Sequence, residues 1–362
     1  MNKRYVRIFL DILSVFVLLY FFFVAIELLG GSFKLIGKDA AKNLIHNATT
    51  SPLIGLLVGT LATAIIQSSS TTTSMVVALV AGGVLDIPHA IPIIMGANIG
   101  TTITNLIVST VHIRANKEFE RAFSAAVVHD IFNIIAVIII FPLQIYFNIL
   151  GKIATFFGEV FEGVGGLKVA SPIKIITKPF TLLLEEIFNK NGYILMAIAF
   201  ILLILALTFL VKVIKRTIVG KVEKFFTDVM FKNAVYSMIL GIILTATVQS
   251  SSVTTSLIVP IAAAGILTLE QVFPYTLGAN IGTTITAILA SLATGNPAAV
   301  IVAFSHLTFN ILGIVIIYPF RIIPLTLAKL FAKISIKFKL FPVLYLLVIF
   351  FLIPGLIIYF GR

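Results

Sequence analysis

Long apolar stretches dominate the chain. Residues 8–29 and 193–211 are almost wholly apolar, and at ~1.5 Å per helical residue each is long enough to cross the ~30 Å hydrocarbon core of a bilayer as a helix. The regular apolar and polar alternation of transmembrane β-strands is missing. Of the 362 residues, 59% are hydrophobic and 11% are charged, whereas a soluble domain carries about 25% charged residues. The pattern predicts an all-α polytopic membrane protein.

Two polar runs interrupt this apolar pattern. Residues 67–74 read Gln-Ser-Ser-Ser-Thr-Thr-Thr-Ser, and residues 249–256 repeat them with one change, Val253 in place of Thr71. The apolar arm before the first run is too short to cross the membrane before the run begins. Hydroxyl and amide groups at that depth are costly unless they bind one another, the backbone or a ligand. We therefore predict a broken or re-entrant helical hairpin around each run, over residues 53–85 and 234–267.

A second motif follows each polar run at the same interval. Residues 96–104, Gly-Ala-Asn-Ile-Gly-Thr-Thr-Ile-Thr, recur unchanged at residues 278–286. Its two glycines and its polar side chains predict a second place where a helix unwinds. Two repeats are therefore expected, and the last span has no counterpart. The predicted segments are residues 1–150 (first repeat), 151–192 (extracellular linker), 193–320 (second repeat) and 321–362 (interfacial helix and C-terminal transmembrane helix).

Positive charge favours a topology in which these repeats are inverted. If each hairpin returns to its side of entry and the N-terminus is cytoplasmic, Lys and Arg are more numerous inside than outside, as the positive-inside rule requires. Topology-setting residues and contacts with anionic lipid then explain the net charge of +12, without nucleic acid. Two lysine stripes predict short interfacial helices: Lys34, Lys38 and Lys42, and Lys329, Lys333 and Lys337.

Broken helices expose backbone groups that can bind ions. Free N–H groups at a helix start suit an anion, whereas free carbonyl and hydroxyl oxygens suit a small cation. None of the four motifs contains Lys or Arg, so an anion bound there needs helix termini, hydroxyl donors and co-bound cations, and the two binding events would be reciprocally coupled. The alternative reading is that Ser, Thr and Gly only allow close helix packing.

Together the motifs resemble the type II sodium-dependent inorganic phosphate cotransporter family. The resemblance rests on both Gln-Ser-Ser-Ser runs, on Gly-Ala-Asn-Ile-Gly-Thr-Thr after each, and on Arg-Ala-Phe and Val-His-Asp-Ile-Phe-Asn within residues 120–142. It implies sodium-coupled import of inorganic phosphate by alternating access across the cell membrane. Both ions would then bind at the midplane between the two runs. Animal members have a large cysteine-containing loop between the halves; here residues 151–191 are short and cysteine is absent, which suggests a bacterial inner-membrane member.

The predicted site is divided between the two repeats. The predicted phosphate ligands are Gln67, Ser68, Ser69, Ser70, Asn98, Gln249, Ser250, Ser251, Ser252 and Asn280. The predicted sodium ligands are Gln67, Ser70, Thr71, Thr101, Thr102, Gln249, Ser252, Thr254, Thr283 and Thr284. The expected partners are phosphate, the coupling sodium ions and the lipid bilayer, with no other cofactor and no enzymatic activity.

Three other functions stay open at this point. The same scaffold could carry another oxyanion, such as sulfate or arsenate, or it could be a passive anion channel. An intramembrane serine hydrolase would need His129 within hydrogen-bond reach of one motif serine, and duplication of the whole run argues against it. Asp130 is expected to pair with Arg121 or to line the ion path, because an acid within a span is costly alone.

Overall fold

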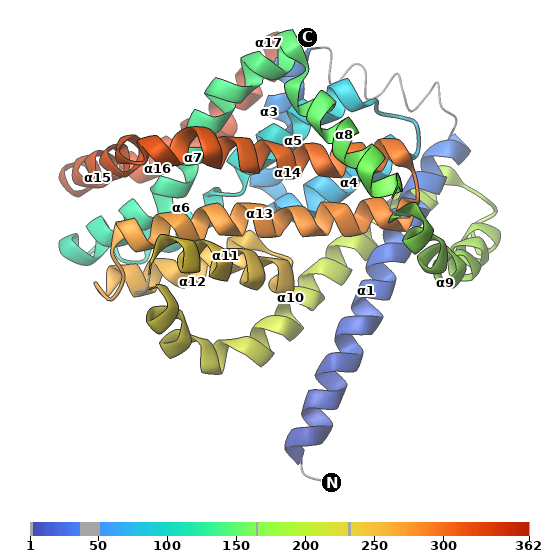
Figure 1. The fold of residues 1–362 in the computed structure, drawn as a ribbon, viewed down its shortest axis with the longest axis horizontal. Helices are drawn as coiled ribbons and strands as arrows, with labels where there is room; N and C mark the ends of the chain where they lie inside the picture. The colour runs from blue at the N-terminus through green and yellow to red at the C-terminus, as the bar shows by residue number, and fades with distance from the viewer. Residues whose placement is uncertain (1–2, 37–50, 164–165, 231–232, 362) are drawn as a thin grey trace.

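The computed structural model describes residues 3–36, 51–163, 166–230 and 233–361. Over these residues the chain is helical apart from short turns, and it contains no strand (Figure 1). Seven of the described helices or helix pairs are long and apolar enough to cross a membrane. The helices are α1 (Lys3–Ile36), α3 (Pro52–Ile66), α4 (Ser69–Ala81), α5 (Ile87–Gly100), α6 (Ile103–Thr110), α7 (Asn116–Phe147), α8 (Ile149–Gly163), α9 (Gly166–Ile187), α10 (Gly192–Met230), α11 (Ala234–Val248), α12 (Ser251–Ala263), α13 (Leu269–Thr294), α14 (Pro297–Ile317), η1 (Tyr318–Phe320), α15 (Ile322–Lys337), α16 (Phe341–Leu347), the π-helical η2 (Val348–Leu352) and α17 (Ile353–Phe360).

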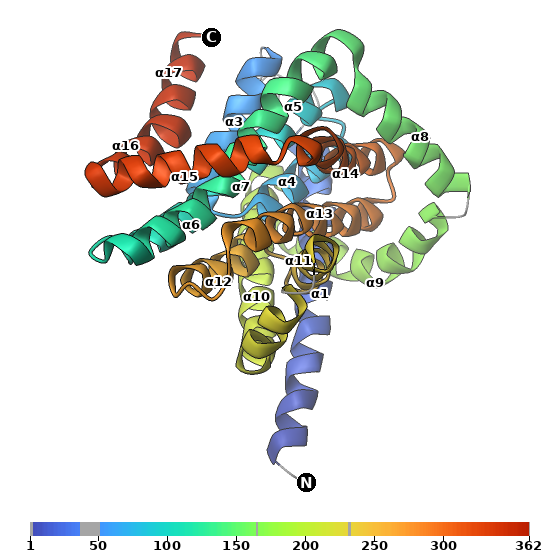
Figure 2. The same cartoon turned by 60° about the vertical axis from the view of Figure 1, so that its left-hand side comes forward.

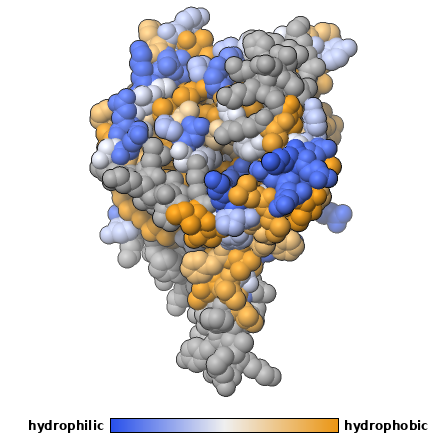
Figure 3. All heavy atoms as spheres, turned by 90° about the vertical axis from the view of Figure 1, so that its right-hand side faces the viewer, coloured by the Kyte–Doolittle hydropathy of each residue, from blue (hydrophilic) through white to orange (hydrophobic). Residues whose placement is uncertain are grey.

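The exterior suits lipid. Large apolar side chains point outward from several of the long helices; Phe16 is 67% exposed, Ile138 65% and Val315 63%. On the face shown in Figure 3, apolar residues cover much of the lower half, whereas polar residues gather above them. Since unpaired apolar surface of this extent is not stable in water, the chain is a polytopic membrane protein, as the composition predicts.

The two polar runs do break their helices. α3 and α4 are separated at Gln67 and Ser68, and α11 and α12 at Gln249 and Ser250. Each of these helices is too short to span a bilayer alone, at 15 or 13 residues. The hairpin predictions are confirmed to this extent.

The two halves use matching helix pairs around the breaks. α3 packs along α5, and α11 packs along α13. α1 lies beside α10, while α13 and α14 run side by side through the middle of the molecule (Figures 1 and 2). Buried aromatic side chains fill the core between α7, α13 and α14, namely Phe119, Phe123, Phe132, Phe273 and Phe309.

The predicted unwinding within the glycine motif is wrong for the second half, and in the first half the break is short. α13 runs without a break through residues 278–286. In the first half α5 and α6 meet at Thr101 and Thr102, and both residues keep right-handed helical angles, with φ of −59° and −76°. The motif therefore interrupts the helix over two residues in the first half and leaves it continuous in the second.

Its glycines serve helix packing instead. A Cβ atom on Gly96 would lie 1.8 Å from the carbonyl oxygen of Leu56, and one on Gly278 would lie 2.0 Å from that of Met238. Any side chain at either position would force α3 from α5, or α11 from α13. For these glycines, the packing alternative raised by the sequence is the correct one.

Residues between and after the repeats are also helical. Residues 151–192, predicted as a linker, lie mainly in α8 and α9; α8 packs on α14, and α9 packs on α1 and α13. The residues predicted as an interfacial helix form α15, which packs on α7 and buries Pro324, Leu325 and Ala328; their place at a membrane surface stays a prediction. The other lysine stripe falls outside the description, since Lys38 and Lys42 are not among the described residues and the side chain of Lys34 is not described.

Candidate functional site

Each helix break centres on a glutamine in an uncommon backbone conformation. Gln67 has φ 57° and Gln249 has φ 59°, both in the left-handed region. Each backbone N–H donates to a carbonyl oxygen in the preceding turn, of Thr63 and Thr245 respectively, at 2.7 Å. A non-glycine residue in this region is uncommon and often marks a functional site. Its occurrence at both glutamines makes the two breaks local structural equivalents.

A serine starts the helix after each break. The Ser68 hydroxyl oxygen accepts the Thr71 backbone N–H at 3.2 Å, and the Ser250 hydroxyl oxygen accepts that of Val253 at 3.4 Å. These bonds cap α4 and α12. The remaining free N–H groups of the first turn carry the positive end of the helix dipole, which favours an anion nearby.

A threonine pair ties the two arms of each hairpin together. The Thr63 hydroxyl donates to the Thr72 hydroxyl at 3.0 Å, and the hydroxyls of Thr245 and Thr254 lie 2.7 Å apart. Both pairs are buried, so the bonds satisfy polar groups that would otherwise be costly. Thr254, a predicted sodium ligand, is therefore already engaged in the hairpin.

The two polar runs meet across the repeats. The Ser70 hydroxyl donates to the carbonyl oxygen of Gln249 at 3.0 Å. The side chain of Gln249 donates to the Ala246 carbonyl oxygen at 2.6 Å and accepts from the Thr286 hydroxyl at 2.7 Å. Residues that are distant in sequence thus meet where the two polar runs approach each other.

A cavity of about 330 Å³ opens where the two runs begin. Gln67, Ser68, Thr71, Gln249 and Ser250, all predicted ligands, contribute to its lining. The starts of α4 and α12 therefore face one space, with hydroxyl and amide donors around it. This is the best candidate for an anion site in the described part of the protein.

One wall of the cavity comes from a helix that sequence reasoning did not include. Thr208 and Lys212 of α10 line it together with two apolar residues of the same helix. No motif marks these positions. The available signal was helical spacing, because residues four apart project from the same face, but this spacing alone does not say which partner the face meets.

Several predicted sodium ligands lie within their own helices. The hydroxyls of Thr101 and Thr283 donate to the carbonyl oxygens of Ala97 and Ala279, at 3.0 and 2.9 Å. Thr284 donates in the same way to Ile281 at 2.7 Å. None of these threonines lines the cavity. Their assignment as sodium ligands stays a prediction without geometric support here.

The serines deeper in each run are buried next to the cavity. Ser69, Ser251 and Ser252 are at most 6% exposed, and they do not contribute to the cavity lining. Within the described residues, no group of three or more His, Cys, Asp or Glu side chains is placed to hold a metal ion. The oxygens around the breaks are hydroxyl, amide and carbonyl oxygens, which suit a hard monovalent cation.

The two predicted asparagines are brought together, but in a buried network rather than at the cavity. His129 Nε2 donates to Asn280 Oδ1 at 2.7 Å, Asn280 Nδ2 donates to Asn133 Oδ1 at 2.8 Å, and Asn133 Nδ2 donates to the carbonyl oxygen of Asn98 at 2.8 Å. The chain of bonds joins α5, α7 and α13. Because every member is nearly fully buried, the network fixes how these helices pack.

The other end of this network reaches the second polar run. Asn105 Nδ2 lies 3.5 Å from His129 Nδ1, and Asn105 Oδ1 accepts from the hydroxyls of Thr255 and Ser256, each at 3.0 Å. Both ring nitrogens of His129 therefore face asparagine amides. The Ser–His pair that an intramembrane hydrolase needs is not formed by His129 in the described residues.

Asp130 is paired, but not with the predicted partner. It accepts from the Thr102 hydroxyl at 2.7 Å and from the Tyr345 hydroxyl of α16. The side chain of Arg121 instead donates to the Ala263 carbonyl oxygen at 2.9 Å. The predicted pairing of Asp130 with Arg121 is wrong, because two hydroxyls satisfy the carboxylate where a guanidinium was expected. Thr102, a predicted sodium ligand, is used in this contact.

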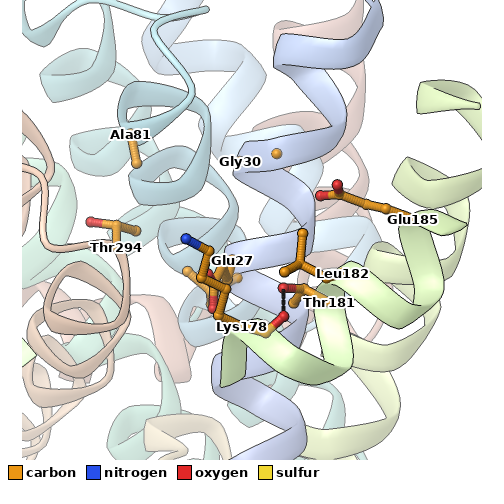
Figure 4. Close-up of a pocket in the computed structure, with 10 residues that line it drawn as sticks. Glu27, Gly30, Ala81, Lys178, Thr181, Leu182, Glu185 and Thr294 are labelled. Carbon is orange, nitrogen blue, oxygen red and sulfur yellow. Dashed lines mark hydrogen bonds between the residues drawn. The ribbon is translucent and has the colours of Figure 1, made fainter. Parts of the chain in front are cut away.

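A second cavity, of about 190 Å³, lies between α1 and α9 (Figure 4). Glu27 of α1 and Lys178, Thr181 and Glu185 of α9 contribute to its lining. Charges of both signs are present, and no residue of either polar run lines it. It is therefore separate from the site at the helix breaks.

A family model of known proteins matches this chain in two separate segments. The family model described as Na+/Pi-cotransporter matches residues 21–169 and 202–352. Each matched segment contains one Gln-Ser-Ser-Ser run. The chain is also 33% identical over 434 residues to human "Sodium-dependent phosphate transport protein 2B", covering 93% of this chain and 63% of the relative.

The 2A relatives are equally similar. The chain is 34% identical over 420 residues to sheep "Sodium-dependent phosphate transport protein 2A", covering 94% of this chain and 66% of the relative. The chain thus spans about two thirds of the length of these relatives. No solved structure matches it significantly.

Proposed function

Since the chain belongs to the Na+/Pi-cotransporter family, we propose that it is a sodium-coupled symporter that imports inorganic phosphate across the cell membrane. The observation that carries this proposal is the cavity of about 330 Å³ between the two polar runs. Two helix starts, those of α4 and α12, border one space lined by predicted ligands from both repeats. Such an arrangement favours an oxyanion, because two dipoles and several neutral donors act on it together.

The phosphate ligands we propose at this cavity are Gln67, Ser68, Gln249 and Ser250. Their hydroxyl and amide groups can donate to phosphate oxygens. The deeper serines of each run would contribute on closure of the site, since they lie directly behind the helix starts. Sodium would bind to carbonyl oxygens at the ends of α3 and α11 and to neighbouring hydroxyls such as Thr71.

The charge of phosphate explains why its import would be coupled to sodium. Concentrating a divalent anion into a negative cell costs ~2.3 kcal/mol per charge for each 100 mV, whereas a tenfold sodium gradient contributes ~1.4 kcal/mol per ion. Two or more sodium ions per phosphate are therefore expected. Each ion stabilises binding of the other by the same factor, because the linkage is reciprocal.

We also propose how the chain is arranged in the membrane. The two repeats are inverted, the N-terminus is cytoplasmic, and the site lies near the midplane of the plasma membrane. The charge distribution and the matching of α3 and α5 with α11 and α13 support this arrangement. Alternating access would then exchange the exposure of the two hairpins.

Uptake by the purified full chain in liposomes tests the proposal. Labelled phosphate should accumulate when an inward sodium gradient is imposed, and an equal potassium gradient should give only background. Uptake without sodium dependence would instead indicate an anion channel. Unlabelled sulfate or arsenate should compete more weakly than phosphate; stronger competition by either would mean that it is the substrate.

A further inference from the structure

Among the described residues that line the cavity between the two polar runs, the charged one is Lys212. It lies on the face of α10 that also carries Ile204 and Thr208, at the helical spacing that places side chains on one side. The other lining residues are uncharged. Unlike the mixed-charge cavity between α1 and α9, this cavity therefore has a net positive charge.

Among the described residues, no carboxylate forms an ion pair with the ammonium group of Lys212. The ion pairs of the described chain involve other residues, and the described contact of Lys212 is with an aromatic ring, with Nζ 5.0 Å from the ring centre of Phe209. A lysine held by a carboxylate would contribute little field to the cavity. An unpaired ammonium retains its full charge for an anion that enters.

The helix starts alone supply only part of the charge that phosphate needs. Each helix start contributes about half a unit of positive charge, and its effect is limited to the first turn of the helix. Neutral hydroxyl and amide donors add hydrogen bonds but no net charge. The proposed sodium ions add positive charge only while they are bound, and none of the four sequence motifs contains a fixed positive charge.

We propose that Lys212 is a substrate-binding residue that supplies the fixed counter-charge for the anion in this cavity. The inference rests on the proposed function, and it adds to that site a residue from outside both polar runs. In the proposed orientation Lys212 lies at the cytoplasmic end of the apolar part of α10, so it acts on phosphate when the cavity is open to the cell interior.

The alternative is that Lys212 only anchors α10 at the membrane surface. Lysines near the end of a span commonly direct their charge to the interface, and this requires no ligand. The two roles differ in what they predict for the affinity of phosphate. An anchor leaves the affinity unchanged, whereas a counter-charge raises it and makes it depend on ionic strength.

The test is a calorimetric titration of inorganic phosphate into the purified full chain in detergent, in sodium-containing buffer. Lys212→Gln should raise the Kd about tenfold and reduce its dependence on ionic strength. Lys212→Arg should stay within about threefold of the unsubstituted chain, because the charge is kept. Lys212→Met, which retains the apolar part of the side chain, should behave like Lys212→Gln and serves if the latter does not fold.

Lys329→Gln is the matched control. Lys329 lines a different cavity and is paired with Glu270 at 2.7 Å, so the phosphate affinity should not change. Unchanged affinity in both Lys212→Gln and Lys212→Met, with normal binding by the unsubstituted chain, would overturn the role of Lys212 alone. If the unsubstituted chain itself does not bind phosphate, the proposed function is wrong and this inference with it.

Discussion

The two halves of this protein build the same hairpin from nearly the same residues, yet they do not hold it in the same state. Both breaks have a left-handed glutamine, a capping serine and a threonine pair. In the second half Gln249 is 7% exposed and bonded to Thr286. In the first half Gln67 is exposed, and the equivalent Thr104 hydroxyl has no partner in the described chain.

This difference indicates that the glutamine side chain at a helix break can occupy two positions, one bonded to its own half and one exposed. Both glutamines line the cavity, but the Gln249 side chain is bonded to Ala246 and Thr286, whereas the Gln67 side chain is exposed. Since the local sequences are almost identical, the choice between these positions depends on the surroundings. If transport proceeds by the alternating access proposed above, the glutamines should exchange roles when the site opens to the other side of the membrane.

A second difference lies in the buried polar groups. His129 is bonded through both ring nitrogens, but His306, its counterpart, has no partner for either nitrogen among the described residues. The sequence explains part of this, because the position equivalent to Asn105 is Ala287. Without that amide, Ser74 also has no partner within the described chain, whereas its counterpart Ser256 is bonded to Asn105.

The strongest effect is expected where the halves agree. Gly96→Ala and Gly278→Ala should each lower the free energy of unfolding by about 3 kcal/mol, because a Cβ would overlap the backbone of the adjacent helix. Thermal unfolding in detergent measures this. Gly355→Ala is the control, since nothing lies within 4 Å of its Cβ position. A large effect at only one of Gly96 and Gly278 would break the structural equivalence of the halves.

Substitution of either glutamine should reduce transport to a similar extent, but the two variants should differ in the stability of the fold. Gln67→Ala and Gln249→Ala should each reduce sodium-dependent uptake at least ~100-fold, which corresponds to about 2.8 kcal/mol of lost binding or transition-state stabilisation. Only Gln249→Ala should also destabilise the fold, by about 1–2 kcal/mol, because the Thr286 hydroxyl and the Ala246 carbonyl lose their partner.

Gln271→Ala is the control for the glutamine variants. Gln271 caps the start of α13 and lies outside the cavity, so uptake should be retained. Normal uptake in both Gln67→Ala and Gln249→Ala would contradict the site assignment, whereas equal loss of stability in both would contradict the two-position interpretation.

The two glycine variants should destabilise the fold equally, whereas the two histidine variants should differ in their effect on the free energy of unfolding. His129→Leu should lower the free energy of unfolding by about 2 kcal/mol, since Asn280 Oδ1 is left buried without a donor. His306→Leu should be neutral or stabilise by up to about 1 kcal/mol, because it removes a buried polar group that has no protein partner in the described chain. A denaturation comparison in which His306→Leu is the more damaging variant would show that its ring is satisfied by a bound ligand.

The smallest expected difference concerns two threonines. Thr286→Val should lower the free energy of unfolding by about 1 kcal/mol, because the Gln249 side chain loses its donor. Thr104→Val should change it by less than about 0.5 kcal/mol, since its hydroxyl has no partner among the described residues. Thermal unfolding of the two isosteric variants measures the difference, and equal effects would mean that Gln67 spends most of its time folded against Thr104.

Part of the site could be read from the sequence because it depends on local rules. A run of hydroxyl residues in an apolar stretch cannot continue a membrane helix cheaply, so both breaks were predicted at the correct residues. In the second half the glycine motif was misread for a related reason, because α13 continues through it. Glycine permits unwinding and also permits close packing, and only the neighbouring helix decides which occurs.

The sequence by itself determined the helical membrane class, the two copies of each motif and the position of each break, because hydrophobic length and polar interruption act over a few helical turns. Tertiary structure alone decided which residues meet: Ser70 with Gln249, Asp130 with Thr102 rather than Arg121, and Lys212 beside both polar runs. Those contacts depend on how separate helices pack, and helix packing is set by the sum of many side-chain fits that no local pattern encodes. For the same reason, two nearly identical motifs can occupy different states in one molecule.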